Sequence, residues 1–83
     1  MMTKIGDRIK EVRVKNELSH DKFGFIVGVT QGAVWSWEHG FTEIKMHNAI
    51  TICKKFKVSM DWLCGLTDES FIPPYNMNNK ETK

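Results

Sequence analysis

Residues 18–40 of the sequence, LSHDKFGFIVGVTQGAVWSWEHG, contain the pattern that decides the fold. Ser19 is a favourable N-cap residue, because its side chain can accept a hydrogen bond from a backbone N–H of the first helical turn. Phe23 and Val27 follow at i,i+4 spacing, as expected for the buried face of a helix. These features predict a first short helix over residues 20–27.

The second half of the same stretch predicts another short helix. Gly28 is a good helix terminator, since glycine adopts the left-handed conformation without strain. Thr30 is a second N-cap, and it predicts a helix over residues 31–38 with Val34 and Trp37 as the inward pair. Two helices of about two turns, joined by a glycine turn, have the length and punctuation of a helix-turn-helix. Helices this short need other helices as a scaffold.

The flanking sequence supplies that scaffold. Apolar residues at helical spacing predict helices over 4–15, 45–56 and 60–64. The expected inward stripes are Ile5, Ile9 and Val12 in the first, and Met46, Ala49, Ile50, Cys53 and Phe56 in the second. The three lysines near residue 56 suit the negative end of that helix dipole. With no convincing strand, the sequence predicts an all-α fold of five helices.

Length and charge suggest one domain followed by a tail. The 83 residues have room for a single core, which we place in residues 1–66. Residues 67–83 contain Pro73 and Pro74 and are expected to be irregular, with disorder over 76–83. The net charge of +2 divides unevenly. Residues 1–60 hold ten basic and six acidic side chains, a net charge of +4, whereas the remaining residues carry −2. The positive charge therefore belongs to the helical body.

Several classes of protein are disfavoured by the sequence. No apolar run reaches the ~18 residues that a membrane span needs, and the N-terminus has no apolar signal core, so we expect a cytoplasmic protein. Cys53 and Cys64 are best explained as small hydrophobic residues. We expect no metal and no cofactor, because His and Cys lack metal-ligand spacing. Without a nucleophile beside a base or a carboxylate pair, we also expect no enzyme.

Five segments in the correct order resemble the phage repressor and Cro-like (Xre-type) helix-turn-helix proteins. They are IGDRIKEVR (5–13), LSHDKFG (18–24), GVT (28–30), VWSWEHG (34–40) and VSMDWL (58–63). The resemblance implies a compact lambda-repressor-like domain in which the two short helices bind DNA. Three positions depart from the usual pattern, which has Gln at His20, Ala at Gly24 and Pro at Ile44.

By this resemblance the second short helix reads DNA in the major groove. The residues expected to face base edges are Thr30, Gln31, Gly32, Trp35 and Ser36. Gln31 suits a bidentate contact with adenine, and glycine allows close approach. Phosphate contacts are expected from His20, Lys22, His39, Lys45 and His47. Without the resemblance, Thr30 could be only a cap, and the lysines could be ordinary solvated side chains.

The family also implies an internal ion pair and a dimer. Arg13 of the first helix is expected to pair with Glu38 and to fix the reading helix against the scaffold. A single module of this size reads few base pairs, so the family binds two half-sites as a homodimer. The expected dimer contact comprises Met60, Trp62, Leu63 and Leu66. Trp62 and Leu63 could also cap the core of one protomer, and the two roles are compatible.

Four large apolar residues stand where the family is usually polar: Phe25, Ile26, Trp35 and Phe41. The tail could cover some of them, or one could simply be exposed. They could also form a surface for a second protomer or a regulatory protein, and Trp35 could pack beside a sugar or a thymine methyl. The leading interpretation is a phage- or prophage-type repressor of operator DNA. The alternative is an antitoxin-like protein-interaction module whose DNA binding is autoregulatory.

Overall fold

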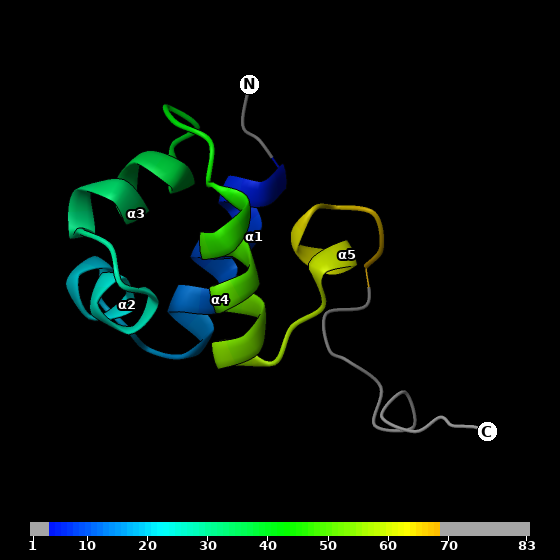
Figure 1. Ribbon diagram of the computed structural model, residues 1–83, viewed down its shortest axis with the longest axis horizontal. Helices are drawn as coiled ribbons and strands as arrows, with labels where there is room; N and C mark the ends of the chain where they lie inside the picture. The colour runs from blue at the N-terminus through cyan, green and yellow to red at the C-terminus, as the bar shows by residue number, and fades with distance from the viewer. Residues whose placement is uncertain (1–3, 69–83) are drawn as a thin grey trace.

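The computed structural model describes residues 4–68, which form five α-helices and no β-strand (Figure 1). They are α1 (Lys4–Lys15), α2 (His20–Val27), α3 (Gln31–Glu38), α4 (Met46–Phe56) and α5 (Met60–Leu63). The predicted all-α class is confirmed. Two boundaries differ by one residue from the prediction, because Lys45 is the N-cap of α4 and Cys64 is the C-cap of α5.

The turn between α2 and α3 forms as the capping residues predict. The Ser19 hydroxyl accepts a hydrogen bond from the Lys22 amide, and the Thr30 hydroxyl accepts one from the Ala33 amide, each at 3.1 Å. Gly28 ends α2 with φ of 94°, in the left-handed region that favours glycine. Both helices of the motif therefore begin at a side chain that caps a free backbone N–H, and α2 ends at a glycine.

Gly24 has a packing role that its low helix propensity conceals. It is buried, and a Cβ at this position would lie 2.6 Å from the carbonyl oxygen of Val29. The absence of a side chain lets the backbone of α2 approach the turn. At the position where the family usually has alanine, this chain leaves no room for a Cβ beside the turn.

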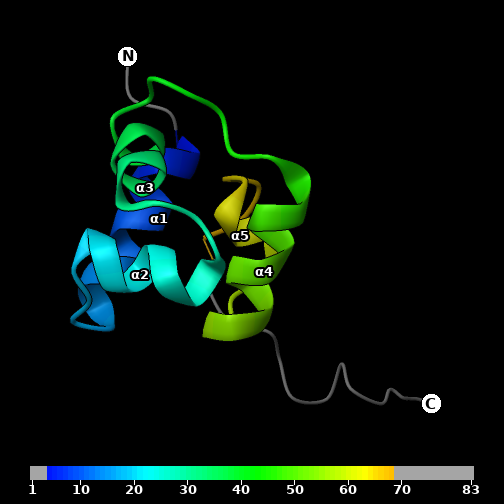
Figure 2. The ribbon, with the colours of Figure 1, turned by 60° about the vertical axis from the view of Figure 1, so that its left-hand side comes forward.

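The core lies between the five helices, with α2 packed against α3 and α4, and α5 packed against α1 and α4 (Figures 1 and 2). Phe23 is fully buried and stacks on Phe56, with ring centroids 5.0 Å apart and an interplanar angle of 10°. The other buried apolar residues are Ile9, Val12, Val27, Val34, Trp37, Ala49, Ile52, Cys53, Trp62 and Leu63.

The predicted stripe of α4 was partly wrong. Ile52 is completely buried, whereas Met46 is 68% exposed and Ile50 is 39% exposed. The buried positions Ala49, Ile52 and Cys53 follow i,i+3,i+4 spacing, so the helix is rotated relative to the expected face. Periodicity alone allowed both faces, and packing against α2 and α5 selected one.

The α5 helix belongs to the core of the protomer. Trp62 and Leu63 are 3% and 1% exposed. Both are therefore core residues of the protomer, and the dimer contact expected of them stays a prediction. Arg8 of α1 lies over the Trp62 ring, with its guanidinium carbon 4.5 Å from the ring centroid.

The same arginine reaches past the predicted domain boundary at residue 66. Arg8 Nη2 donates to Asp68 Oδ1 at 3.2 Å, so the chain still contacts the domain at this point. The division at residue 66 stays a prediction. The tail beyond Asp68, including the segment expected to be disordered, lies outside the described residues.

Candidate nucleic-acid interface

A buried carboxylate fixes the end of α3 to the scaffold. Glu38 is 3% exposed and receives two hydrogen bonds from Arg13 of α1, from Nε at 2.7 Å and from Nη2 at 3.0 Å. This bidentate arrangement is the geometry in which a guanidinium binds a carboxylate best. The hydrogen bond with Glu38 raises the pKa of Arg13 above its ordinary value, although partial burial opposes the shift. The expected pair is thus brought together.

His20 joins this pair. Its Nε2 lies 3.2 Å from Glu38 Oε1, and because a carboxylate oxygen accepts, the imidazole donates. Arg13 Nη1 also donates to the Leu18 carbonyl at 3.1 Å. One carboxylate therefore connects α1, the start of α2 and the end of α3. A role for His20 at a phosphate would have to use its other ring nitrogen, since Nε2 is engaged.

Next to this network, one face of α3 is open. Gln31 and Gly32 are exposed, and Trp35 is 46% exposed. With His20 they line a shallow hollow of ≈300 Å³. Thr30 is exposed as well, but its hydroxyl oxygen already serves as the helix cap.

Ser36 differs from the other expected base readers. It is half-buried, and its Oγ accepts a hydrogen bond from Thr42 Oγ1 at 2.9 Å. The loop that follows α3 thus covers part of this residue. Its own hydroxyl proton is left as the group that could reach DNA.

Four of the five expected phosphate contacts are exposed, in α2, at the end of α3 and at the start of α4. Lys22 lies in the first turn of α2, His39 is the C-cap of α3, Lys45 is the N-cap of α4 and His47 lies in its first turn. No side chain caps α4 at Lys45. The loop carrying the chain from α3 to α4 is seen most clearly in Figure 2.

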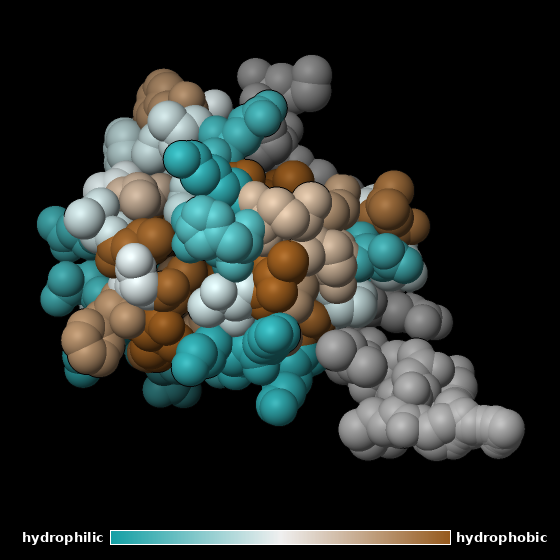
Figure 3. Space-filling model, in the orientation of Figure 1, coloured by the Kyte–Doolittle hydropathy of each residue, from teal (hydrophilic) through white to brown (hydrophobic). Residues whose placement is uncertain are grey.

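The four unusual apolar residues divide into two groups. Trp35 and Phe41 stack on each other beside α3, with ring centroids 5.5 Å apart. Phe25, 87% exposed, and Ile26 belong to α2, where they line a separate hollow with Leu18, Asp21 and Lys22. Figure 3 shows apolar residues gathered over the junction of α2 and α3 and again over α4.

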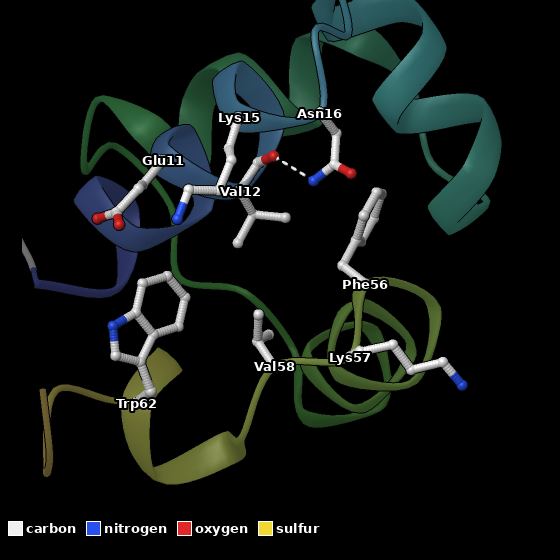
Figure 4. Close-up of a pocket in the computed structure, with 8 residues that line it drawn as sticks. All are labelled: Glu11, Val12, Lys15, Asn16, Phe56, Lys57, Val58 and Trp62. Atoms are coloured by element: carbon white, nitrogen blue, oxygen red, sulfur yellow. Dashed lines mark hydrogen bonds between the residues drawn. The ribbon is translucent and has the colours of Figure 1, made fainter. Parts of the chain in front are cut away.

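Of the expected dimer residues, two remain accessible. Leu66 is 79% exposed and Met60 is half-buried. A pocket of ≈240 Å³ lies near α5, between the ends of α1 and α4 (Figure 4). Val12, Val58 and Trp62 point into it, while Lys57 points away. Because no residue of α2 or α3 lines this pocket, it is separate from the candidate interface.

The described residues also bear on metal binding, membrane insertion and thiol chemistry. Residues 4–68 contain no group of three His, Cys, Asp or Glu side chains that could hold a metal ion. No described helix is long and apolar enough to cross a membrane. The two thiols are free, Cys53 buried and Cys64 exposed, and burial raises the pKa of Cys53.

Solved structures with the same arrangement include DNA-binding proteins. The P22 c2 repressor in complex with synthetic operator 9T is similar with a TM-score of 0.69 and 31% identity, over 74% of this chain and 92% of that chain. The restriction-modification controller protein C.AhdI from Aeromonas hydrophila gives a TM-score of 0.67 over the same shares. At 23% identity, that second likeness shows the fold alone.

Sequence comparison agrees with the structural likeness. An uncharacterized HTH-type transcriptional regulator, YgzD of Bacillus subtilis (strain 168), is 33% identical over 64 residues, which cover 77% of this chain and 97% of the relative. The helix-turn-helix family model matches residues 9–63, and this range includes the whole of α2 and α3. The chain therefore belongs to the helix-turn-helix family of Cro- and repressor-like DNA-binding transcriptional regulators.

Proposed function

We propose that this regulator is a phage- or prophage-type repressor that binds operator DNA as a homodimer, with α3 in the major groove. The observation that carries the proposal is the contrast between the two faces of α3. Val34, Trp37 and Glu38 are buried, whereas Gln31 and Gly32 are exposed. A helix held firmly on one side and open on the other is suited to the groove.

The residues proposed to face the bases are those expected from the sequence: Thr30, Gln31, Gly32, Trp35 and Ser36. Gln31 is the best candidate for direct reading, since it is exposed and an amide can pair with adenine in a bidentate manner. Thr30 and Ser36 each retain a hydroxyl proton to donate, because their oxygens are the accepting atoms in the hydrogen bonds described above.

Positive charge beside α3 supports the proposed phosphate contacts. Lys22 and Lys45 are exposed in α2 and at the N-cap of α4, respectively, and His39 and His47 accompany them. We propose that these side chains hold the protein in register on the duplex while α3 reads the sequence. His20 contributes mainly through Glu38, which it helps to position.

The proposed dimer rests on a smaller surface than expected from the sequence. Leu66, just after α5, is large, apolar and 79% exposed. Met60, the first residue of α5, is half-buried. Leu66→Glu should shift sedimentation toward the monomer and weaken operator binding, while binding to a single half-site stays unchanged. Unaltered sedimentation of a dimeric protein would place the contact elsewhere.

Selection of binding sites from random duplex DNA tests the main proposal. We expect a palindromic consensus with half-sites about one helical turn apart. Gln31→Ala should lose about tenfold or more in affinity for the consensus and little for random DNA, as expected for a bidentate base contact. Binding without any sequence preference, or no binding at low salt, would contradict the proposal.

Salt titration separates the phosphate contacts from base reading. Lys22→Ala should weaken binding to every sequence and reduce the salt slope by about one. Lys55→Ala is the matched control, since this lysine lies in the last turn of α4 rather than beside α3. Equal effects of the two variants would show only general charge attraction.

One observation favours a second candidate, the antitoxin-like interaction module. Phe25 is 87% exposed and lines a hollow of ≈390 Å³ with Ile26 and Leu18. An exposed apolar patch of this kind is typical of a surface that binds another protein. If the purified chain binds operator DNA only after a co-purifying partner is added, and Phe25→Ala abolishes that complex, the interaction module is the better description.

A further inference from the structure

Trp35 stands at the centre of an exposed aromatic cluster formed by Trp35, His39 and Phe41. Its ring centroid is 4.0 Å from that of His39 and 5.5 Å from that of Phe41, with interplanar angles of 24° and 22°. All three residues are exposed, so the cluster does not owe its order to burial. Large aromatic side chains at the surface of a binding helix are candidates for contact with a ligand.

Hydrogen bonds hold the cluster in place. The His39 Nδ1 group lies 2.8 Å from the Trp35 carbonyl oxygen, and since that oxygen can only accept, Nδ1 carries the proton. The Phe41 amide donates to the Ser36 carbonyl at 3.0 Å, and Thr42 donates to the Ser36 hydroxyl. The loop after α3 is thus pinned to the helix. The rings of His39 and Phe41 stack on the Trp35 indole and restrict its motion. This restriction reduces the conformational entropy that the indole loses on binding.

Neither packing nor backbone conformation requires a glycine at position 32, next to Trp35 on α3. A Cβ at this position would meet no closer atom than Thr30 Oγ1 at 3.9 Å, and its φ is not positive. Glycine within a helix costs about 1 kcal/mol relative to alanine, so neither packing nor backbone geometry explains it. Gly24 is the opposite case, because a Cβ there would strike the backbone.

The missing side chain leaves open the hollow lined by His20, Gln31, Gly32 and Trp35. None of these four residues is acidic, and the Glu38 carboxylate next to His20 is paired with Arg13. The indole gives it an apolar wall, and Gln31 places an amide at its edge. The apolar group that a base pair presents in the major groove is the C5-methyl of thymine.

We propose that Trp35 is a specificity-determining residue whose indole, together with bare Gly32, receives the C5-methyl of one operator thymine. The inference rests on the proposed binding of α3 in the major groove. His39 and Phe41 are positioning residues, which hold the indole at the angle that the methyl group meets. Gln31 reads a neighbouring base pair from the same face.

Replacing thymine by deoxyuridine tests the contact, because this change removes only the methyl group. Each thymine of the selected operator is replaced in turn, and affinity is measured by fluorescence anisotropy. With the wild-type protein, one position in each half-site should lose about fourfold, as expected for one buried methyl group. With Trp35→Ala, thymine and deoxyuridine should bind equally at that position, since the effects are coupled.

Gly32→Ala provides a second variant that fills the hollow without disturbing the fold. Its Cβ fits the protein, so its melting temperature should not fall, yet the fourfold preference for thymine should disappear. Val14→Ala is the matched control, an exposed apolar side chain of α1 that lines no part of the hollow. It should retain the full preference.

The possible outcomes are distinguishable. Equal preference for thymine in wild type and Trp35→Ala overturns the proposal. The proposal is also overturned if Trp35→Ala weakens binding but deoxyuridine has no effect on the wild-type protein at any position. That result would place the indole on the sugar–phosphate chain instead. If the wild-type protein selects no DNA sequence at all, both this inference and the proposed function fail.

Discussion

Two aromatic stacks lie on opposite sides of the helix-turn-helix. Inside, Phe23 of α2 stacks on Phe56 of α4 at 5.0 Å, and Phe23 is fully buried. Outside, Trp35 of α3 stacks on His39 and Phe41 at 4.0 and 5.5 Å, with Trp35 and Phe41 46% and 70% exposed. The ring geometries are similar, whereas the surroundings are opposite.

The difference shows that ring contact alone does not indicate a role. The inner stack removes apolar surface from water and joins α2 to α4, so its loss should be felt in the free energy of unfolding. The outer stack buries little and leaves large ring faces in solvent. Loss of the outer stack should therefore change the affinity for DNA more than the free energy of unfolding. Matched substitutions on the two sides can therefore support or break this distinction.

The largest effect is expected from Phe23→Ala. Truncation of a fully buried phenylalanine costs about 3–5 kcal/mol of unfolding free energy, because it leaves a cavity and removes the partner of Phe56. Phe25→Ala, two residues away and 87% exposed, is the control and should change stability by less than about 0.5 kcal/mol. Urea unfolding followed by circular dichroism measures both. Similar losses in the two variants would contradict the distinction.

Glu38→Gln should rank second. The substitution keeps the shape of the side chain but leaves Arg13 without its carboxylate partner, and the Arg13 side chain is only 12% exposed. We expect a loss of about 2–3 kcal/mol, less than for a fully buried pair because Arg13 keeps its bond to Leu18. Exposed Glu11→Gln on α1 is the control. A stability loss no larger than that of Glu11→Gln would mean that the hydrogen bonds of Glu38 with Arg13 and His20 do not stabilise the fold.

Replacing Gly24 or Gly32 by alanine makes the same chemical change at a packed site in α2 and at an open site in α3. Gly24→Ala should destabilise by about 1–2 kcal/mol, because its methyl group strikes the Val29 carbonyl and this overpacking outweighs the gain in helix propensity. Gly32→Ala meets open space and should stabilise by up to about 1 kcal/mol. Chemical denaturation of both variants gives the sign. A stabilised Gly24→Ala protein would mean that the turn shifts at little cost.

The smallest perturbation uses the two thiols as probes. Cys64 is exposed and should react promptly with a thiol reagent, whereas Cys53 is buried, and its burial raises its pKa and lowers the thiolate fraction. Absorbance should record one fast equivalent in the native protein and a second after denaturant is added. In Cys64→Ser the fast phase should vanish. Two fast equivalents would show that α4 opens readily.

Local sequence signals predicted most of the secondary structure. Ser19, Thr30 and Gly28 mark helix ends through contacts within a few residues. Their effect can therefore be predicted from the sequence alone. Ile52 was missed because an amphipathic helix can satisfy its periodicity with more than one face. Arg8 was also missed, although it follows Ile5 by three residues on the apolar stripe of α1. That placement could have indicated its contact with Trp62.

The candidate interface was predictable in part. The residues of α3 came from the family resemblance, and the structure places Gln31, Gly32 and Trp35 together. The link between His20 and Glu38 spans 18 residues and depends on how α2 and α3 cross, which no local signal contains. The burial of Trp62 and Leu63 likewise follows from where α5 docks, so Met60 and Leu66 are the more accessible of the residues expected at a dimer contact.

The sequence by itself determined the helices, their caps, the turn and the family, because each depends on neighbouring residues or on motif order. Only the tertiary structure decided that Trp62 is buried and that Phe25, Trp35 and Phe41 are exposed. It also separated Gly24, where the backbone of the turn leaves no room for a side chain, from Gly32, where a Cβ would face open space. Burial and close approach are properties of packed helices, and they arise from contacts between residues far apart in the chain.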